Sequence, residues 1–504
     1  MNHDARVAAL EIGERLLQEP SERLVNTAFA SELTAQTGLV RAVGWVDLAH
    51  TLRLASDGVI PAPAARELVA ALLDLQVAPE SFAPRAEFGD LYTNREAWLT
   101  GKTSSAAWLG VARARREALT TAFHLTLCDA LCGLGDALLT SAETFSETSL
   151  RHKGSLMPDY TYLQAAQPTT FGHYLQTFAF PVLRDVDRVV ALHARADQCP
   201  AGIGSSNGST IRQDRWALAA SLGFPAPVRH ARDAMWLHDL SIEACSIAVA
   251  ASVNLDRLAE DLMIFASAEF GFVRLADRHA RASKIMPQKR NPFALAFVRA
   301  TANRLIGVQT GVSAAGRTPS GQMDNRLFVY AAAPDAVTSV AEAALLVAEC
   351  LKDLTFDAAR AGAALADRSV CATDLAERLS AKAKIDYRRA HGIVGALMSG
   401  LEATGQTLAD ATVDDVLASL RAADVFLDRK HIQQVVFTAL DPAACVAART
   451  DYGCAAETEV AAMAEELKSE IRVKRDALQA LRGRREEAID RLLGEAAAFV
   501  SEAG

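Results

Sequence analysis

Apolar residues recur at the spacing of an α-helix along much of the chain. One stripe follows the i, i+3, i+4, i+7 rule, which places its members on a single helix face: Val337, Val340, Ala341, Ala344, Val347, Ala348 and Leu351. The stretch from Glu243 to Ala266 is apolar over more of its circumference. Because a helix that is apolar nearly all round must be buried on several sides, we expect this stretch inside a bundle or between subunits.

Proline spacing and helix length divide the chain into three parts. Residues 1–111 hold several prolines among short helical patterns, residues 112–365 carry the long patterns, and residues 366–504 have a different texture. Proline disfavours helix interiors and marks starts and turns, so these changes indicate boundaries. We therefore predict an all-α protein of three helical domains, with a central long-helix bundle that forms the core of an oligomer.

The last segment, Glu457 to Val500, has an amphipathic helix pattern that is dense in both signs of charge. Its cluster of Arg482, Arg484 and Arg485 is expected on a solvated face, because charge runs of this kind are usually solvated.

Composition supports a helical protein and narrows its partners. Half of the 504 residues are hydrophobic but only 6% are aromatic, so the apolar content comes from Ala, Leu and Val. The net charge of −9 argues against a nucleic-acid or anionic-membrane binder, and no uncharged apolar stretch reaches the roughly 20 residues that span a bilayer. The first residues lack a secretory pattern, and the eight cysteines form no CxxC pair. These features predict a cytoplasmic protein with reduced thiols.

Two patterns that resemble ligand sites are weak. His124, Cys128 and Cys132 share a helix face, but no fourth metal ligand is evident nearby, so small buried residues on an apolar face are favoured over a soft-metal site. The GxGxxxG run from Gly202 to Gly208 follows no strand, so it does not predict a nucleotide fold. Its neighbouring serine, threonine and asparagine side chains would either contact a ligand or cap the next helix. We predict no metal and no cofactor.

Three polar segments interrupt the helical texture and carry the candidate chemistry: Gly154 to His173, Pro200 to Arg215 and Leu275 to Pro292. The third is rich in Arg and Lys and places Ser283 six residues before Lys289. Cations and backbone N–H groups near a serine stabilise its alkoxide, which is what a hydroxyl needs to act as a base. The alternative interpretation is a solvated basic loop.

These segments together resemble the fumarase/aspartase superfamily, most closely its argininosuccinate lyase branch. SKIMPQKRNP resembles the superfamily's signature loop GSSxMPxKxNP, and MPDYTYLQAAQPTTFGHYL resembles the branch's PGYTHLQxAQPxTFGH. The resemblance continues through ATDLAERLSAKAKIDYRRAHGIVG and covers most of the chain. It implies three helical domains with a central five-helix bundle, joined in a homotetramer around a twenty-helix core. Each active site would draw on three chains.

The resemblance also implies a reaction and its residues. The expected chemistry is β-elimination from a small anionic substrate of the dicarboxylate type, usually with release of fumarate. Ser283 matches the base of the family. The resemblance assigns the other matching positions to binding of substrate and intermediate: Lys289, Asn291, Thr161, Gln164, Arg113 and Arg115.

The chain departs from the branch at the site itself. Tyr162 and Ala296 replace the His and Glu that form a pair on the acid side, so Tyr162 is expected to serve the leaving group. Other departures lie in the substrate cradle, in the signature loop and in the segment that would contact the amino-acid end of argininosuccinate: Ala114, Arg116, Lys284, Met323, Asn325 and Phe328. Arg116, Lys284 and Asn325 are expected to bind substrate, whereas Met323 and Phe328 are equally well interpreted as core side chains.

We therefore predict a carbon–nitrogen lyase, or its reverse addition enzyme, acting on an N-substituted aspartate or related succinyl compound in specialised metabolism. The departures argue against argininosuccinate itself. One alternative is an enzyme of the same fold acting on a C–O bond or on a non-succinyl substrate. Another is a catalytically inactive structural homologue, although Ser283 and Lys289 have no evident purpose in a scaffold.

Overall fold

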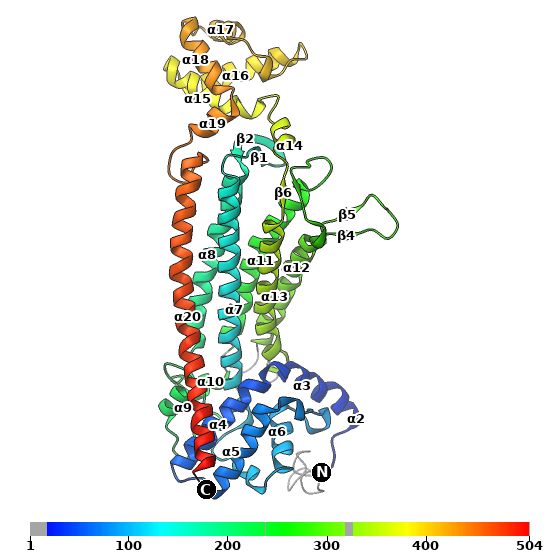
Figure 1. The fold of residues 1–504 in the computed structure, drawn as a ribbon, viewed down its shortest axis with the longest axis vertical. Coiled ribbons are helices and arrows are strands. Elements are labelled where there is room, and N and C mark those ends of the chain that lie inside the picture. The colour runs from blue at the N-terminus through cyan, green and yellow to red at the C-terminus, as the bar shows by residue number, and fades with distance from the viewer. Residues whose placement is uncertain (1–17, 237, 318–325, 503–504) are drawn as a thin grey trace.

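The structure is a computed structural model that describes residues 18–236, 238–317 and 326–502. Its long axis follows a bundle of long helices, with a group of short helices at each end (Figure 1). The all-α prediction is confirmed. The described chain adds only three small two-stranded sheets, each a short antiparallel pair.

Short helices build the end of the molecule at which the N-terminus lies (Figure 1). Prolines start or separate several of them, as at Pro61, the N-cap of α5 (Ala62–Val77). The elements are α2 (Glu22–Leu24), the π-helix η1 (Val25–Phe29), α3 (Ala30–Gln36), η2 (Thr37–Leu39), α4 (Val40–Ser56), α5 (Ala62–Val77), η3 (Pro79–Ser81), η4 (Ala86–Phe88), α6 (Leu91–Thr100) and η5 (Ser104–Trp108).

The long helices of the bundle run nearly side by side (Figure 1). They are α7 (Arg115–Arg151), α8 (Phe171–Ala196), α11 (Asp239–Phe265), α12 (Phe293–Ala315) and α13 (Arg326–Lys352). The predicted stripe from Val337 to Leu351 lies on α13, and α11 packs against α8, α12 and α13. Between α8 and α11 lie two short helices, α9 (Arg215–Ser221) and α10 (Ala231–Trp236).

A separate apolar core holds the short helices at the opposite end. Its buried side chains run from Leu365 to Cys445 and are distinct from those of the bundle core. The elements there are α14 (Ala358–Ala363), η7 (Ser369–Cys371), α15 (Ala372–Ala383), α16 (Tyr387–Glu402), η8 (Leu408–Asp410), α17 (Val413–Ala422), α18 (Arg429–Ala439) and α19 (Pro442–Ala447).

The last helix, α20 (Glu457–Ser501), returns along the whole bundle, where Figure 1 shows it in red. Its apolar side chains join the bundle core, and it packs against α7, α8, α5 and α4. The expectation of a solvated arginine cluster holds for Arg484, which is exposed, and in part for Arg482, but it is wrong for Arg485, which is buried. Arg484 and Arg485 both pair with the buried Asp197, while Arg482 pairs with Asp136. An amphipathic pattern does not show which charges pair across helices.

Two bundle helices are long and apolar enough, by length and composition alone, to cross a membrane: α7 and the Phe328–Lys352 part of α13. The sequence criterion missed both because it required an uncharged stretch. More than half of each apolar window is buried inside the fold, as is usual for a core helix of a bundle.

Candidate active site

The predicted base, Ser283, lies on a hairpin that projects from the bundle (Figure 1). Its two-residue strands, β4 (Arg281–Ala282) and β5 (Arg290–Asn291), pair in antiparallel register. Just beyond this register, the Ser283 N–H donates to the Lys289 carbonyl at 3.3 Å. The Asn291 side-chain amide donates to the Arg281 carbonyl at 3.0 Å. The hairpin therefore brings three predicted site residues together: Ser283, Lys289 and Asn291.

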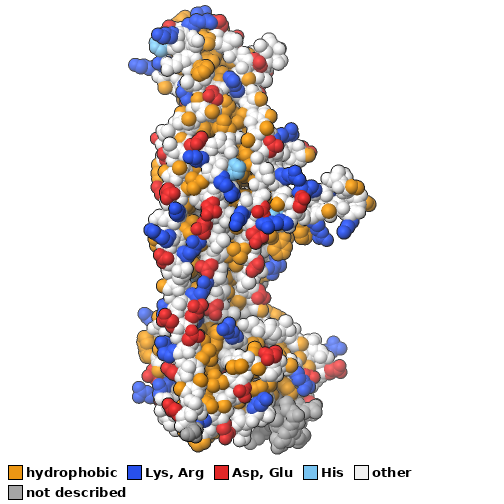
Figure 2. All heavy atoms as spheres, in the orientation of Figure 1, with side chains coloured by type: hydrophobic (Ala, Val, Ile, Leu, Met, Phe, Trp, Pro, Cys, Tyr) orange, Lys and Arg blue, Asp and Glu red, His pale blue; other side chains and the backbone are white. Residues whose placement is uncertain are grey.

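The hydroxyl of Ser283 lies where backbone donors converge. Its Oγ accepts hydrogen bonds from the N–H groups of Met286 at 3.0 Å and Ile285 at 3.3 Å. Such donors favour the ionised form of an acidic group. Figure 2 shows Lys and Arg side chains gathered on the projecting arm, where Lys284 and Lys289 are exposed. The two backbone donors are consistent with the prediction that Ser283 is the base, which stays a prediction.

A second hairpin carries Thr161, Tyr162 and Gln164 at the end of the bundle near the C-terminal short helices (Figure 1). Its strands are β1 (Leu156–Thr161) and β2 (Gln164–Thr170), and Thr161 pairs directly with Gln164. The two turn residues, Tyr162 and Leu163, both have positive φ angles, of 55° and 58°. This left-handed conformation is costly for bulky residues.

The ring of Tyr162 is 98% exposed in the single chain. An aromatic side chain held outward on a strained turn gains nothing from the packing of its own chain. Strain of this kind clusters at functional sites, which supports a role for Tyr162 in contacting a ligand or another chain.

The arginine segment precedes and begins α7 at the other end of the bundle. Arg116 is exposed, and Arg115 is partly exposed with its Nε 3.5 Å from Asp90 Oδ2. Arg113 is placed differently from our expectation. Its side chain is buried, its Nη2 lies 2.8 Å from Asp47 Oδ1, and its guanidinium stacks over the ring of Tyr92. This burial argues against a ligand contact for Arg113, and we reassign it to fixing the start of α7.

Sequence reasoning missed Glu117, the residue that follows these arginines. Its buried carboxylate accepts a hydrogen bond from the Gly202 N–H at 2.7 Å, and so joins the arginine segment to the glycine-rich loop. Burial raises the pKa of Glu117 to about 7, although the Gly202 N–H and the Arg113 charge oppose that shift. Its second oxygen, Oε2, is buried with no hydrogen-bond partner among the described residues. A Glu beside three arginines gave no sequence signal of this role.

Glu117→Gln should stabilise the protein at high pH only. A carboxyl whose pKa is higher in the folded state loses stabilisation as pH rises from its unfolded value of 4.5 towards 7. The shift corresponds to about 3 kcal/mol, so the melting temperature of the variant should exceed that of the parent by about 3 °C near pH 8 and match it near pH 4.5. Differential scanning fluorimetry across pH measures this. The exposed Glu147 on the same helix supplies the control, Glu147→Gln. Parallel pH profiles for parent and Glu117→Gln would contradict the assignment.

The three groups of site residues are too far apart in one chain to share a small molecule. Helix α7 has 37 residues, which separates Arg115 from the β1–β2 hairpin by about 55 Å at 1.5 Å per residue. The start of α13 lies beside the start of α7, where the Thr120 and Tyr330 hydroxyl groups are 3.2 Å apart. The far end of α13 contacts the root of the Ser283 hairpin, about 35 Å away along the helix.

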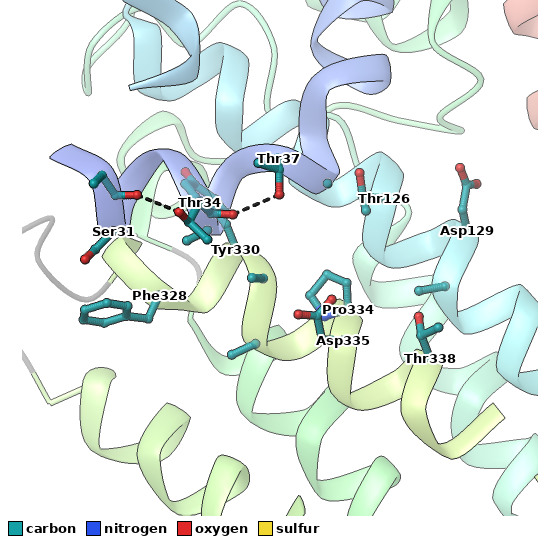
Figure 3. Close-up of a pocket in the computed structure, with 16 residues that line it drawn as sticks. Ser31, Thr34, Thr37, Thr126, Asp129, Phe328, Tyr330, Pro334, Asp335 and Thr338 are labelled. Atoms are coloured by element: carbon teal, nitrogen blue, oxygen red, sulfur yellow. Dashed lines mark hydrogen bonds between the residues drawn. The ribbon is translucent and has the colours of Figure 1, made fainter. Parts of the chain in front are cut away.

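A cavity of about 990 Å³ lies between α3, α7 and α13 (Figure 3). Among the site positions singled out from the sequence, only Phe328 lines it, at its edge beside Ser31. Phe328 is 65% exposed, so its interpretation as a core side chain is wrong. Met323 and Asn325 lie outside the described residues.

The structure explains the two patterns that resemble ligand sites in the sequence: the helix face of His124, Cys128 and Cys132, and the GxGxxxG run. Burial raises the pKa of the Cys128 thiol, and raises that of Cys132 to about 11, which disfavours the thiolate that a metal needs. His124 Nδ1 lies 2.9 Å from the Ala196 carbonyl. All three glycines of the GxGxxxG run have positive φ, so they form a tight loop rather than the start of a nucleotide-binding helix.

Comparison with known proteins agrees with the fold. A family model described as Lyase matches residues 93–307, and one described as Argininosuccinate lyase C-terminal matches residues 369–447. An EDDS lyase in complex with formate is 22% identical, covers 99% of each chain and has a TM-score of 0.84. A fumarate lyase:delta crystallin from Brucella melitensis bound to cobalt is 20% identical over 87% of this chain and 94% of its own, with a TM-score of 0.66.

A third similar structure is the 3-carboxy-cis,cis-muconate lactonizing enzyme from Pseudomonas putida. It is 22% identical over 85% of this chain and 95% of its own, with a TM-score of 0.66. The fold and the two family matches together define an all-helical lyase. These matches support a place in the fumarase/aspartase superfamily, with an argininosuccinate lyase-like C-terminal part.

Proposed function

We propose that this lyase breaks the C–N bond of an N-substituted aspartate or related succinyl compound and releases fumarate, or catalyses the reverse addition. The observation that carries the proposal is the Ser283 hairpin, where two backbone N–H groups converge on the hydroxyl next to Lys289. Similarity to an EDDS lyase, of which a variant is known with bound fumarate, supports the C–N class. Assignment to specialised metabolism and to the cytoplasm is part of the same proposal.

In the proposed reaction, the Ser283 alkoxide removes the proton from Cβ of the substrate. The electron pair of the C–H bond moves into the adjacent carboxylate, which becomes a dianion, and Lys289 and Asn291 stabilise the added charge. Collapse of the dianion forms the C=C bond of fumarate as the C–N bond breaks. The leaving nitrogen takes the electron pair of that bond and a proton from the acid side.

Tyr162 is proposed to serve the leaving group, with Thr161 and Gln164 beside it on the same turn. An ordinary phenol, with a pKa near 10, is a weaker acid than imidazolium. A substrate with a good leaving group needs less help from the acid, and the loss of the His and Glu positions of the branch therefore favours a leaving group other than that of argininosuccinate.

The distances within one chain support a site that is assembled from several chains. Arg115 and Arg116 lie at one end of the bundle, whereas Ser283 and Tyr162 belong to hairpins near the other end. We propose a homotetramer in which antiparallel bundles bring an arginine segment of one chain to the hairpins of others. Arg115, Arg116 and Lys284 would then surround a small dianionic substrate.

A substrate panel tests the proposed class. Purified protein is incubated with N-substituted aspartates, EDDS and argininosuccinate among them, with hydroxy acids and substrates that lack a succinyl unit, and with fumarate plus amines. Fumarate release or consumption is followed by absorbance, and products of the non-succinyl substrates are followed by mass spectrometry. We expect turnover of at least one N-substituted aspartate and little of argininosuccinate. Turnover confined to hydroxy acids or to substrates without a succinyl unit would replace the C–N assignment with the first alternative. No turnover by a folded tetramer would favour the inactive homologue.

A further inference from the structure

The Ser283 hairpin is too small to hold its own position. Its two strands have two residues each, and the loop between them is mostly exposed. An isolated two-stranded hairpin is marginally stable at best in water. The location of the Ser283 hydroxyl must therefore be set at the root of the hairpin, where the chain leaves the bundle.

One contact at this root has a buried histidine as its partner. His279, in the turn η6 (Asp277–His279), has a side chain only 4% exposed, and its Nε2 lies 2.9 Å from Asp353 Oδ2. Asp353 follows the last residue of α13, and the β3 (Val273–Arg274) and β6 (Thr355–Phe356) pair flanks the contact. The contact thus ties the hairpin root to the end of a bundle helix.

The neighbours of His279 determine how its ring is used. Arg278 pairs with the same Asp353 oxygen, and its Nε lies 3.3 Å from His279 Nε2. An arginine Nε can only donate, so the contact with Arg278 requires His279 Nε2 without a proton. A carboxylate can only accept, so the contact with Asp353 requires a proton on the same nitrogen. The shorter distance to the carboxylate favours a proton on Nε2, which the ring donates to Asp353.

Arg290 makes two further ties at the root. Its Nη2 donates to the Leu275 carbonyl at 3.2 Å, and it pairs with Asp277, whose side chain is 84% exposed. Exposed ion pairs contribute little to stability, whereas removing one partner of a buried group costs more. Of the side-chain contacts at the root, the His279–Asp353 contact has the most buried partner, His279, and joins the root to the end of α13.

We propose that the His279–Asp353 hydrogen bond positions the Ser283 hairpin for catalysis. His279 precedes Ser283 by four residues, up to about 13 Å of extended chain, so it acts as a positioning residue and does not contact the reacting atoms. The inference rests on the proposed function, because it assigns a purpose to the location of Ser283. An error of about 1 Å in a catalytic group costs up to about 100-fold in rate.

Two single variants and their combination test the proposal. His279→Ala and Asp353→Ala should each lower kcat about 10- to 100-fold, and the double variant should be no worse than either, because both remove the same contact. His279→Gln keeps a donor near the position of Nε2 and should recover most of the rate. The matched control is Asp277→Asn, which breaks the exposed pair on the same turn and should change kcat by less than about threefold.

Hydrogen–deuterium exchange gives a readout that needs no substrate. The amides of Ile285 and Met286, which donate to Ser283 Oγ, should exchange faster in His279→Ala than in the parent and return towards the parent rate in His279→Gln. The bundle peptides should not change. If a folded His279→Ala variant shows the same amide exchange and the same kcat as the parent, His279 does not position the hairpin. That conclusion would hold even if Ser283 proves essential. If no substrate is found, exchange still tests the inference while the proposed function fails.

Discussion

Ser283→Ala should lower kcat by about 100- to 10,000-fold, the range that removal of a general base produces. The two backbone N–H groups at 3.0 and 3.3 Å from Oγ stabilise an alkoxide and have no comparable partner in an alanine variant. Because the base acts in the transition state, KM should change little. Fumarate release by the best substrate of the panel, measured over a range of substrate concentrations, separates the two constants.

The matched control is Ser419→Ala. Ser419 lies on α17 among the C-terminal short helices, where its hydroxyl donates to the Asp415 carbonyl at 3.0 Å. Ser419→Ala removes a serine hydroxyl, as Ser283→Ala does, but far from the hairpin. This variant should therefore keep the kcat of the parent. Turnover by Ser283→Ala equal to that of the control would eliminate Ser283 as the base. It would also favour the interpretation of the hairpin as a solvated basic loop.

The long helices were predictable because burial imposes a period on the sequence. The stripe from Val337 to Leu351 lies on α13, and the Glu243 to Ala266 stretch coincides closely with α11. Burial on one face requires apolar residues every three or four positions, whatever the partner helix is. Domain boundaries are less constrained by this pattern, as α20 illustrates by joining the bundle core from the end of the chain.

The hairpins were not predictable by the same means. The turn at Tyr162 and Leu163 has the positive φ angles of a tight hairpin but lacks the Asn-Gly or Asp-Gly pair that usually marks one. Motif similarity found the residues of the site without their surroundings. It grouped Arg113 with Arg115, although Arg113 is buried and Arg115 is partly exposed. Arg113 is buried against Asp47 and Tyr92, which lie far from it in the sequence, so a local motif cannot show that burial.

Contacts between distant residues were beyond the sequence for the same reason. His279 and Asp353 are separated by 74 positions, and Glu117 and Gly202 by 85. Neither pair forms a local motif, so no spacing rule points to it. Each contact becomes evident only in the folded structure, where the helices place residues that are distant in sequence next to one another.

Mixing two inactive variants should restore activity. Ser283→Ala keeps the arginine segment intact, whereas Arg115→Gln keeps the Ser283 hairpin intact. Because about 35 Å of α13 separates these groups within one chain, a site that uses both must take them from different chains. In randomly mixed tetramers, about a quarter of the sites should then combine an intact arginine segment with an intact hairpin, so activity should rise from near zero to about a quarter of the parent value.

The experiment co-expresses the two variants with different affinity tags, isolates tetramers that carry both tags and measures fumarate release. A mixture of the separately purified variants, without subunit exchange, is the control and should stay inactive. Co-expression of Ser283→Ala with the Ser283→Ala/Arg115→Gln double variant should also stay inactive, because no chain then supplies the base. Inactive mixed tetramers of the two single variants would contradict a shared site. Because the length of α7 and α13 excludes a site within one chain, that outcome would also remove Arg115 from the substrate cradle.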